Sequence, residues 1–158
     1  MKTSTFKMIL IYSLVLFALP TLGLAEAISQ SESDAARILM LEKALAPKTP
    51  DAVASMFAEA NKDRNGAVQF MLFSDQLKNK YKDNWPYWVS GASSPWITSY
   101  KIKKTAQKKN SWQFQITYEW ATSAGPFQPA LLQTIVVEPV PKNIHASQQW
   151  WITQFSEG

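Results

Sequence analysis

The chain has 158 residues, a formal net charge of +4 and no cysteine. Without cysteine it has neither disulfides nor the lipid-modified cysteine of a lipoprotein, so its stability must come from burial. The modest charge argues against nucleic acid as a partner, because a nucleic-acid-binding domain needs a dense basic surface.

Residues 1–27 have the pattern of an export signal. Two lysines precede the apolar run Met8–Leu19, and a proline then interrupts the chain before a stretch of small residues. This pattern predicts a signal peptide that is cleaved after Ala27 or, as the alternative, after Ala25. The mature chain is then secreted or extracytoplasmic. The segment holds the chain in a membrane only if it stays uncleaved, since a spanning helix needs about 20 apolar residues.

Residues 28–48 are predicted to form a polar leader and a first helix. A hydroxyl cap at Ser33 starts this helix, which is predicted to run through Ala44 and to end near Pro47. Its large apolar residues recur at the helical spacings of three and four: Ile38, Leu41 and Leu45.

Residues 49–158 are predicted to form the main domain, which begins with two further helices. Thr49 before Pro50 is a strong helix start, because the hydroxyl caps the first turn and proline lacks only an N–H that has no partner there. The second helix has one apolar stripe, made of Val53, Met56, Phe57 and Ala60. A third helix is predicted from Gly66 to Lys80.

The second half of the chain is predicted to be an antiparallel sheet. One strand has large apolar residues at every second position, which is typical of a strand with one buried face: Trp112, Phe114, Ile116, Tyr118 and Trp120. The strand before it carries Trp96, Tyr100 and Ile102, and the turn between the two is predicted at 108–110. Other strands are predicted at 87–90, 131–138 and 148–155, with a connection at 123–129. Helices followed by antiparallel strands predict a two-layer α+β domain.

Several short strings add a family resemblance. Thr49-Pro50-Asp51, the run 65–70, the run 93–100 and the terminal 150–153 together resemble extracytoplasmic domains of the nuclear-transport-factor-2-like (cystatin-like) superfamily, which occur in exported or membrane-anchored bacterial proteins. The resemblance implies N-terminal helices packed on a strongly curved antiparallel sheet. The sheet would wrap around the helices as a cone, with a pocket at its wide end.

Four aromatic residues are the candidate ligand-binding residues: Trp96, Tyr100, Tyr118 and Trp120. Their rings either line a pocket, where flat amphipathic groups stack on a ligand, or form the core under the helices. No catalytic residue is predicted. His145, the only histidine, is expected in a loop without an orienting partner, and Glu119 is expected to face solvent. One histidine and no cysteine predict no metal site, and nothing in the sequence predicts a cofactor.

The chain is therefore expected to be an exported, non-catalytic binding or interaction domain of the bacterial cell envelope. Its partner would be a small molecule, a peptide or an envelope protein, and not nucleic acid. One alternative is a small pocket enzyme of the isomerase or hydrolase kind on the same fold. The other is a structural or inhibitory protein that acts through the outer face of the sheet, where members of the superfamily often form homodimers.

Overall fold

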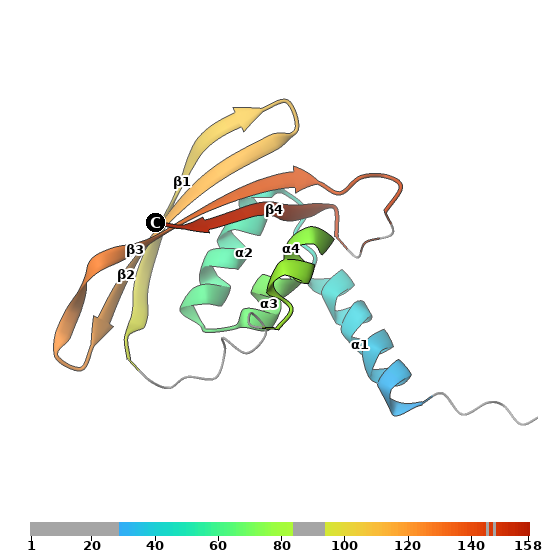
Figure 1. Cartoon of the computed structure of the whole chain (residues 1–158), viewed down its shortest axis with the longest axis horizontal. Helices are drawn as coiled ribbons and strands as arrows, with labels where there is room; N and C mark the ends of the chain where they lie inside the picture. Colours follow the sequence, from blue (N-terminus) through green and yellow to red (C-terminus); the bar gives the residue numbers. More distant parts are fainter. Residues whose placement is uncertain (1–28, 84–93, 145, 147) are drawn as a thin grey trace, which may run out of the picture.

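The computed structural model describes residues 29–83, 94–144, 146 and 148–158. Its elements in chain order are α1 (Gln30–Leu45), α2 (Pro50–Lys62), α3 (Gly66–Met71), α4 (Asp75–Tyr81), β1 (Trp96–Lys108), β2 (Ser111–Thr122), β3 (Gly125–Pro139) and β4 (Trp150–Glu157). The strands form one antiparallel sheet in the order β1-β2-β3-β4. Helices α2, α3 and α4 lie on one face of the sheet (Figure 1). The predicted α+β architecture, with N-terminal helices on an antiparallel sheet, is confirmed.

The predicted cone is wrong, because the sheet is not strongly curled. The helix layer consists of α2 and two short helices, so it covers only part of the sheet. The hairpin of β2 and β3 extends beyond these helices (Figure 1). An apolar sheet face is normally buried against another layer, and within residues 29–83 and 94–144 no helix lies over the far end of the β2–β3 hairpin for the sheet to wrap around.

Helix α1 begins earlier than predicted. Ser29 is its cap: the Ser29 hydroxyl accepts from the N–H of Glu32 at 3.3 Å, and the Glu32 carboxylate accepts from the N–H of Ser29 at 2.9 Å. This reciprocal pair is a capping box, which satisfies two backbone N–H donors at the start of the helix. The predicted cap at Ser33 would satisfy only one. No residue of α1 is buried, and the helix points away from the rest of the chain (Figure 1). In the part of the chain that the structure describes, no helix is long and apolar enough to cross a bilayer.

Helix α2 starts as predicted and supplies much of the core. Thr49 accepts from the N–H of Ala52 at 3.1 Å, and Pro50 occupies the first turn. The helix buries one face against the sheet, with Val53, Ala54, Phe57 and Ala58 fully inaccessible to solvent. It lies beside β1, where the ammonium of Lys104 is 2.9 Å from the carboxylate of Asp51.

The predicted third helix is two helices, because the backbone between them pairs with β4. The N–H of Ser74 donates to the carbonyl of Ile152 at 2.8 Å, and the N–H of Ile152 donates to the carbonyl of Leu72 at 2.8 Å. These bonds form a short parallel bridge between Phe73 and Ile152. Ser74 then caps α4 by accepting from the N–H of Leu77 at 3.4 Å.

The bridge directs Phe73 into the core. Its ring centroid lies 5.9 Å from that of Phe57, 6.2 Å from that of Phe155 and 5.8 Å from that of Tyr81. Phe57 and Phe155 are also 5.9 Å apart. Tilted ring pairs at these distances add to the stabilisation from burial, which is about 1.5–3 kcal/mol for a large apolar side chain. The core is thus centred where α2, the α3–α4 segment and β4 meet.

The turns of the sheet match the prediction in one hairpin and differ in the other. β1 and β2 join at Lys109 and Asn110, as predicted. β2 and β3 join at Ser123 and Ala124, because Gly125 pairs with Thr122 and adopts a φ of 120°, which suits a tight turn. The predicted connection over 123–129 is therefore wrong beyond its first two residues. The strand predicted at 87–90 lies outside the described residues.

The core analysis predicts that Phe57→Ala lowers the free energy of unfolding by about 3–5 kcal/mol, since the substitution leaves a cavity between Phe73 and Phe155. The measurement is equilibrium unfolding in urea. Met40→Ala on α1 is the control, because Met40 is 69% exposed and its removal should change the free energy by less than about 0.5 kcal/mol. Equal effects of the two substitutions would contradict this description of the core.

Candidate functional site

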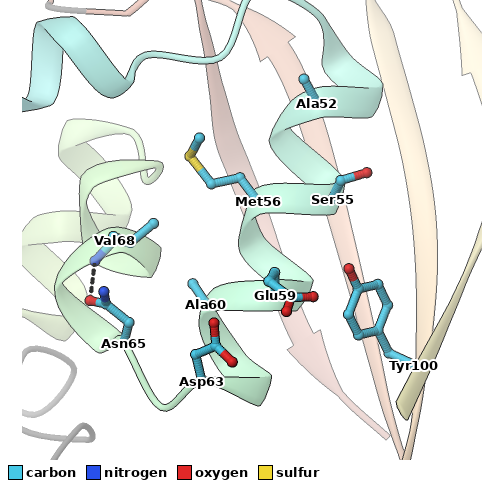
Figure 2. Close-up of a pocket in the computed structure, with 9 residues that line it drawn as sticks. All are labelled: Ala52, Ser55, Met56, Glu59, Ala60, Asp63, Asn65, Val68 and Tyr100. Atoms are coloured by element: carbon cyan, nitrogen blue, oxygen red, sulfur yellow. Dashed lines mark hydrogen bonds between the residues drawn. The ribbon is translucent and has the colours of Figure 1, made fainter.

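A hollow of about 510 Å³ lies along the outer side of α2, open to solvent. We call it the α2 trough. Its residues come from successive turns of α2 and the cap that ends it, from α3 and the turn before it, and from β1: Ala52, Ser55, Met56, Glu59, Ala60, Asp63, Asn65, Val68 and Tyr100. Figure 2 shows α2 as the floor, with Tyr100 on one side and Val68 and Asn65 on the other.

The trough follows from the spacing of residues on α2. Positions three and four apart share one face of a helix, so Ala52, Ser55, Met56, Glu59, Ala60 and Asp63 form one stripe. Three of these side chains are alanine or serine, which keeps the floor low. The opposite stripe, which includes Val53 and Phe57, is buried against the sheet. One helix therefore serves both the core and the trough.

Glu59 is the charged centre of the trough. The Lys62 ammonium lies 2.8 Å from the Glu59 carboxylate and, together with the nearby Tyr100 hydroxyl, holds the pKa of Glu59 below its usual value. In return the carboxylate raises the pKa of Lys62. The pKa of Tyr100 is raised chiefly by its interaction with Glu59 and secondarily by burial. All three shifts favour an ionised Glu59 and a neutral Tyr100 at neutral pH.

A second carboxylate, Asp63, lies one turn further along, at the C-cap of α2. Figure 2 shows it near Glu59 and Asn65 at the same end of the trough. The Asn65 side chain is occupied by the helix, since its oxygen accepts from the N–H of Val68 at 3.1 Å and caps α3. The trough thus combines a mostly apolar floor with a negative end.

This arrangement suits binding better than acid–base catalysis. A general base works best with a pKa near the operating pH, which requires the pKa of a carboxyl group to be raised. The pKa of Glu59 is shifted in the opposite direction by Lys62. A lowered pKa makes the carboxylate a weaker base and a more permanent negative charge, which is a feature of recognition.

The structure separates the four candidate ligand-binding residues. Tyr100 lines the trough. Trp96 and Trp120 lie at the far end of the sheet, where Trp96 is 43% exposed and the Trp120 ring is 5.2 Å from that of Phe127. Tyr118 has no exposed surface. The ligand-binding role of these residues stays a prediction.

Tyr118 belongs to a buried polar group under α2. Burial raises the pKa of its hydroxyl, which has Asn61 nearby but makes no hydrogen bond of normal geometry. The Asn61 amide donates to Gln133 at 3.4 Å, and the Gln133 amide donates to the Glu157 carboxylate at 2.6 Å. These contacts connect α2 to β3 and β4.

The other residues weighed from sequence lie apart from the trough. Glu119 is exposed on β2. His145 falls outside the described residues, so the structure does not bear on it. The trough residues Glu59 and Asp63 were not among the sequence-based candidates. The predicted apolar stripe of the second helix included Met56 and Ala60, which the structure places in the trough beside Glu59 and Asp63.

No protein-family model matches the chain, and no curated protein matches it in sequence. Among solved structures, it is similar to a "putative calcium/calmodulin-dependent protein kinase type II association domain" from Thiobacillus denitrificans. The TM-score is 0.53 at 12% identity, over 71% of this chain and 95% of that one. The chain has an association-domain-like fold. The similarity supports the coarser prediction of an α+β fold with an antiparallel sheet.

At this identity the similarity concerns the association-domain-like fold alone. It does not transfer a partner, a ligand or an assembly to this chain. The site must therefore be judged from the chemistry of the α2 trough.

The electrostatics of the trough predict opposite effects of two substitutions on the pKa of Tyr100. Glu59→Gln should lower the pKa toward its usual value, because the amide lacks the negative charge that opposes ionisation of the phenol. Lys62→Met should raise it further, because the ammonium favours the phenolate. The measurement is titration by ultraviolet absorbance, with Tyr100→Phe identifying the signal among the five tyrosines. An unchanged Tyr100 titration in Glu59→Gln would contradict this description.

Proposed function

We propose that the chain is an exported, non-catalytic interaction domain of the bacterial cell envelope, and that it binds an apolar segment of a protein in the α2 trough. The observation that carries the proposal is the trough itself, a hollow of about 510 Å³ along one helix, with small side chains on its floor. Export is proposed from the signal pattern of residues 1–27.

The shape of the trough favours a protein segment over a small molecule. Sites for small molecules usually enclose most of the ligand surface. The α2 trough is open along the helix from Ala52 to Asp63, with Tyr100 and Val68 as low walls. An amphipathic helix that lays its apolar side in such a groove is a common mode of peptide recognition.

The chemistry of the trough indicates the kind of segment. Ala52, Met56, Ala60 and Val68 offer apolar contacts, and the exposed carboxylate of Asp63 offers a partner for a cation beside the Glu59–Lys62 pair. A segment with exposed leucine or isoleucine side chains and a lysine or arginine near one end would complement both features. Burial of the apolar side chains would supply most of the affinity, and the charges would set the orientation.

Site-specific photo-crosslinking tests this proposal. A photoreactive amino acid replaces Ser55 in the trough or, as the matched control, Ser99, which is exposed on β1 outside the trough. In cells that export the full chain, the Ser55 position should give covalent adducts with protein and the Ser99 position should give few. Mass spectrometry then identifies the partner and the crosslinked segment. Absence of adducts specific to Ser55 would overturn the trough as a binding surface.

A further inference from the structure

A row of lysines lies on the outer face of β1, which is turned away from the helices. The side chains of β1 that pack against the core alternate with side chains on this outer face. Lys101 and Lys103 lie on the outer face, and the register with β2 places Lys108 there as well, beyond the bulge at 104–106. Lys109 follows in the turn. We call these four exposed residues the β1 lysine row.

The β1 lysine row has no ion-pair partner among the described residues. Lys104, on the inner face of the same strand, differs in this respect, because its ammonium is 2.9 Å from the carboxylate of Asp51. Three neutral polar side chains of β2 lie beside the row: Gln113, Gln115 and Thr117. The carboxylate of β2, Glu119, is opposite Ser99, beyond the end of the row. Like charges along one strand repel one another, and an anionic ligand would relieve this repulsion.

The length of the row indicates a polymer as the ligand. At about 3.3 Å per residue, Lys101 and Lys108 are at most roughly 23 Å apart along the strand. A single small anion can reach only adjacent lysines, whereas a linear chain with a negative group on each unit can contact the whole row. The side-chain amides and hydroxyl of Gln113, Gln115 and Thr117 can in addition hydrogen-bond to hydroxyl groups of the chain.

Trp96 indicates that the units of this polymer are sugars. Trp96 pairs with Ala121, two residues after Glu119, so the register places its ring on the same face as the row. The ring is 43% exposed, and a flat aromatic ring offers a surface on which a sugar can stack. A site for a membrane surface would instead have several exposed apolar groups beside the lysines. Within β1, which the structure describes completely, Trp96 is the one large apolar side chain that is exposed.

We propose that the β1 lysine row and Trp96 bind a linear acidic polysaccharide, a chain of sugars that carry carboxylates. The lysines contact successive carboxylates, Gln115 and Thr117 hydrogen-bond to hydroxyl groups, and Trp96 stacks on a sugar beyond the end of the row. The helices and the α2 trough lie on the other face of the sheet (Figure 1). The polysaccharide site is therefore independent of the proposed function, and one chain can hold a protein segment and a polysaccharide at the same time.

Calorimetric titration of the exported chain with oligogalacturonates tests the proposal, because each sugar of these oligomers carries one carboxylate. Each contact of an exposed lysine with a carboxylate is weak, so the affinity should depend on the number of contacts. An oligomer long enough to span the row should bind at least about tenfold more tightly than a short one. Uncharged dextran oligomers of equal length should not bind. Equal affinities of the long and short oligomers, or no binding of the long one at low ionic strength, would overturn the proposal.

A pair of matched double variants locates the site. Lys101→Gln with Lys103→Gln should weaken binding of the long oligomer at least about fivefold and reduce its dependence on salt. Lys43→Gln with Lys82→Gln removes the same charge from two exposed positions on α1 and at the end of α4, and should retain the affinity. The first variant should unfold at no lower urea concentration than the unchanged chain, since neither lysine has an ion-pair partner among the described residues. Equal losses of affinity in the two double variants would overturn the row as the site.

Two further ligands separate recognition of sugars from recognition of charge alone and from binding to a membrane. Trp96→Ala should weaken binding of the long oligogalacturonate several-fold and leave the weaker binding of polyglutamate unchanged, because only a sugar stacks on the ring. Equal losses for both polymers would overturn the role of Trp96, and tighter binding of polyglutamate would overturn the sugar as the ligand. Vesicles of phosphatidylglycerol should bind less tightly than the long oligomer. A preference for the vesicles would assign the row to a membrane surface and overturn the polysaccharide.

Discussion

Ile152 connects the last strand to the helix layer through its backbone. Its N–H and carbonyl bond to Leu72 and Ser74, and most of the remaining architecture depends on this short bridge. The bridge divides one predicted helix into α3 and α4. It also directs Phe73 into the core, where its ring meets those of Phe57 and Phe155. The buried stripe of α2 is thereby held against the sheet, which leaves the opposite stripe to form the α2 trough.

The parts of the fold that depend on local sequence were predictable. The start of α2 follows from Thr49 and Pro50, and the hairpin at Lys109 and Asn110 follows from the alternating pattern on both sides. The break between α3 and α4 was not predictable in this way, because it depends on hydrogen bonds to a strand about 80 residues later. The cone was wrong for a similar reason, since sheet curvature depends on how much helix surface the sheet must cover.

The candidate site was predicted only in part. Tyr100 lies in the trough, whereas Tyr118, its partner on the neighbouring strand, is completely buried. Alternation tells which face of a strand a residue occupies, but it does not tell whether a helix covers that face. The acidic residues Glu59 and Asp63 were not predicted as site residues, because one stripe of α2 lines a trough only where other elements form walls on either side of it. Those walls belong to β1 and α3, and no pattern within α2 indicates them.

The bridge at Ile152 also bears on the order of folding. Phe155 completes the ring cluster around Phe57, and Trp150 binds the carbonyl of Lys48, so residues about 100 positions apart must meet before the core closes. Contacts of such long range slow folding, because a large loop must close before they stabilise the chain. A chain that lacks its last nine residues has neither Trp150 nor Phe155. The core can therefore close only after β4 has been made.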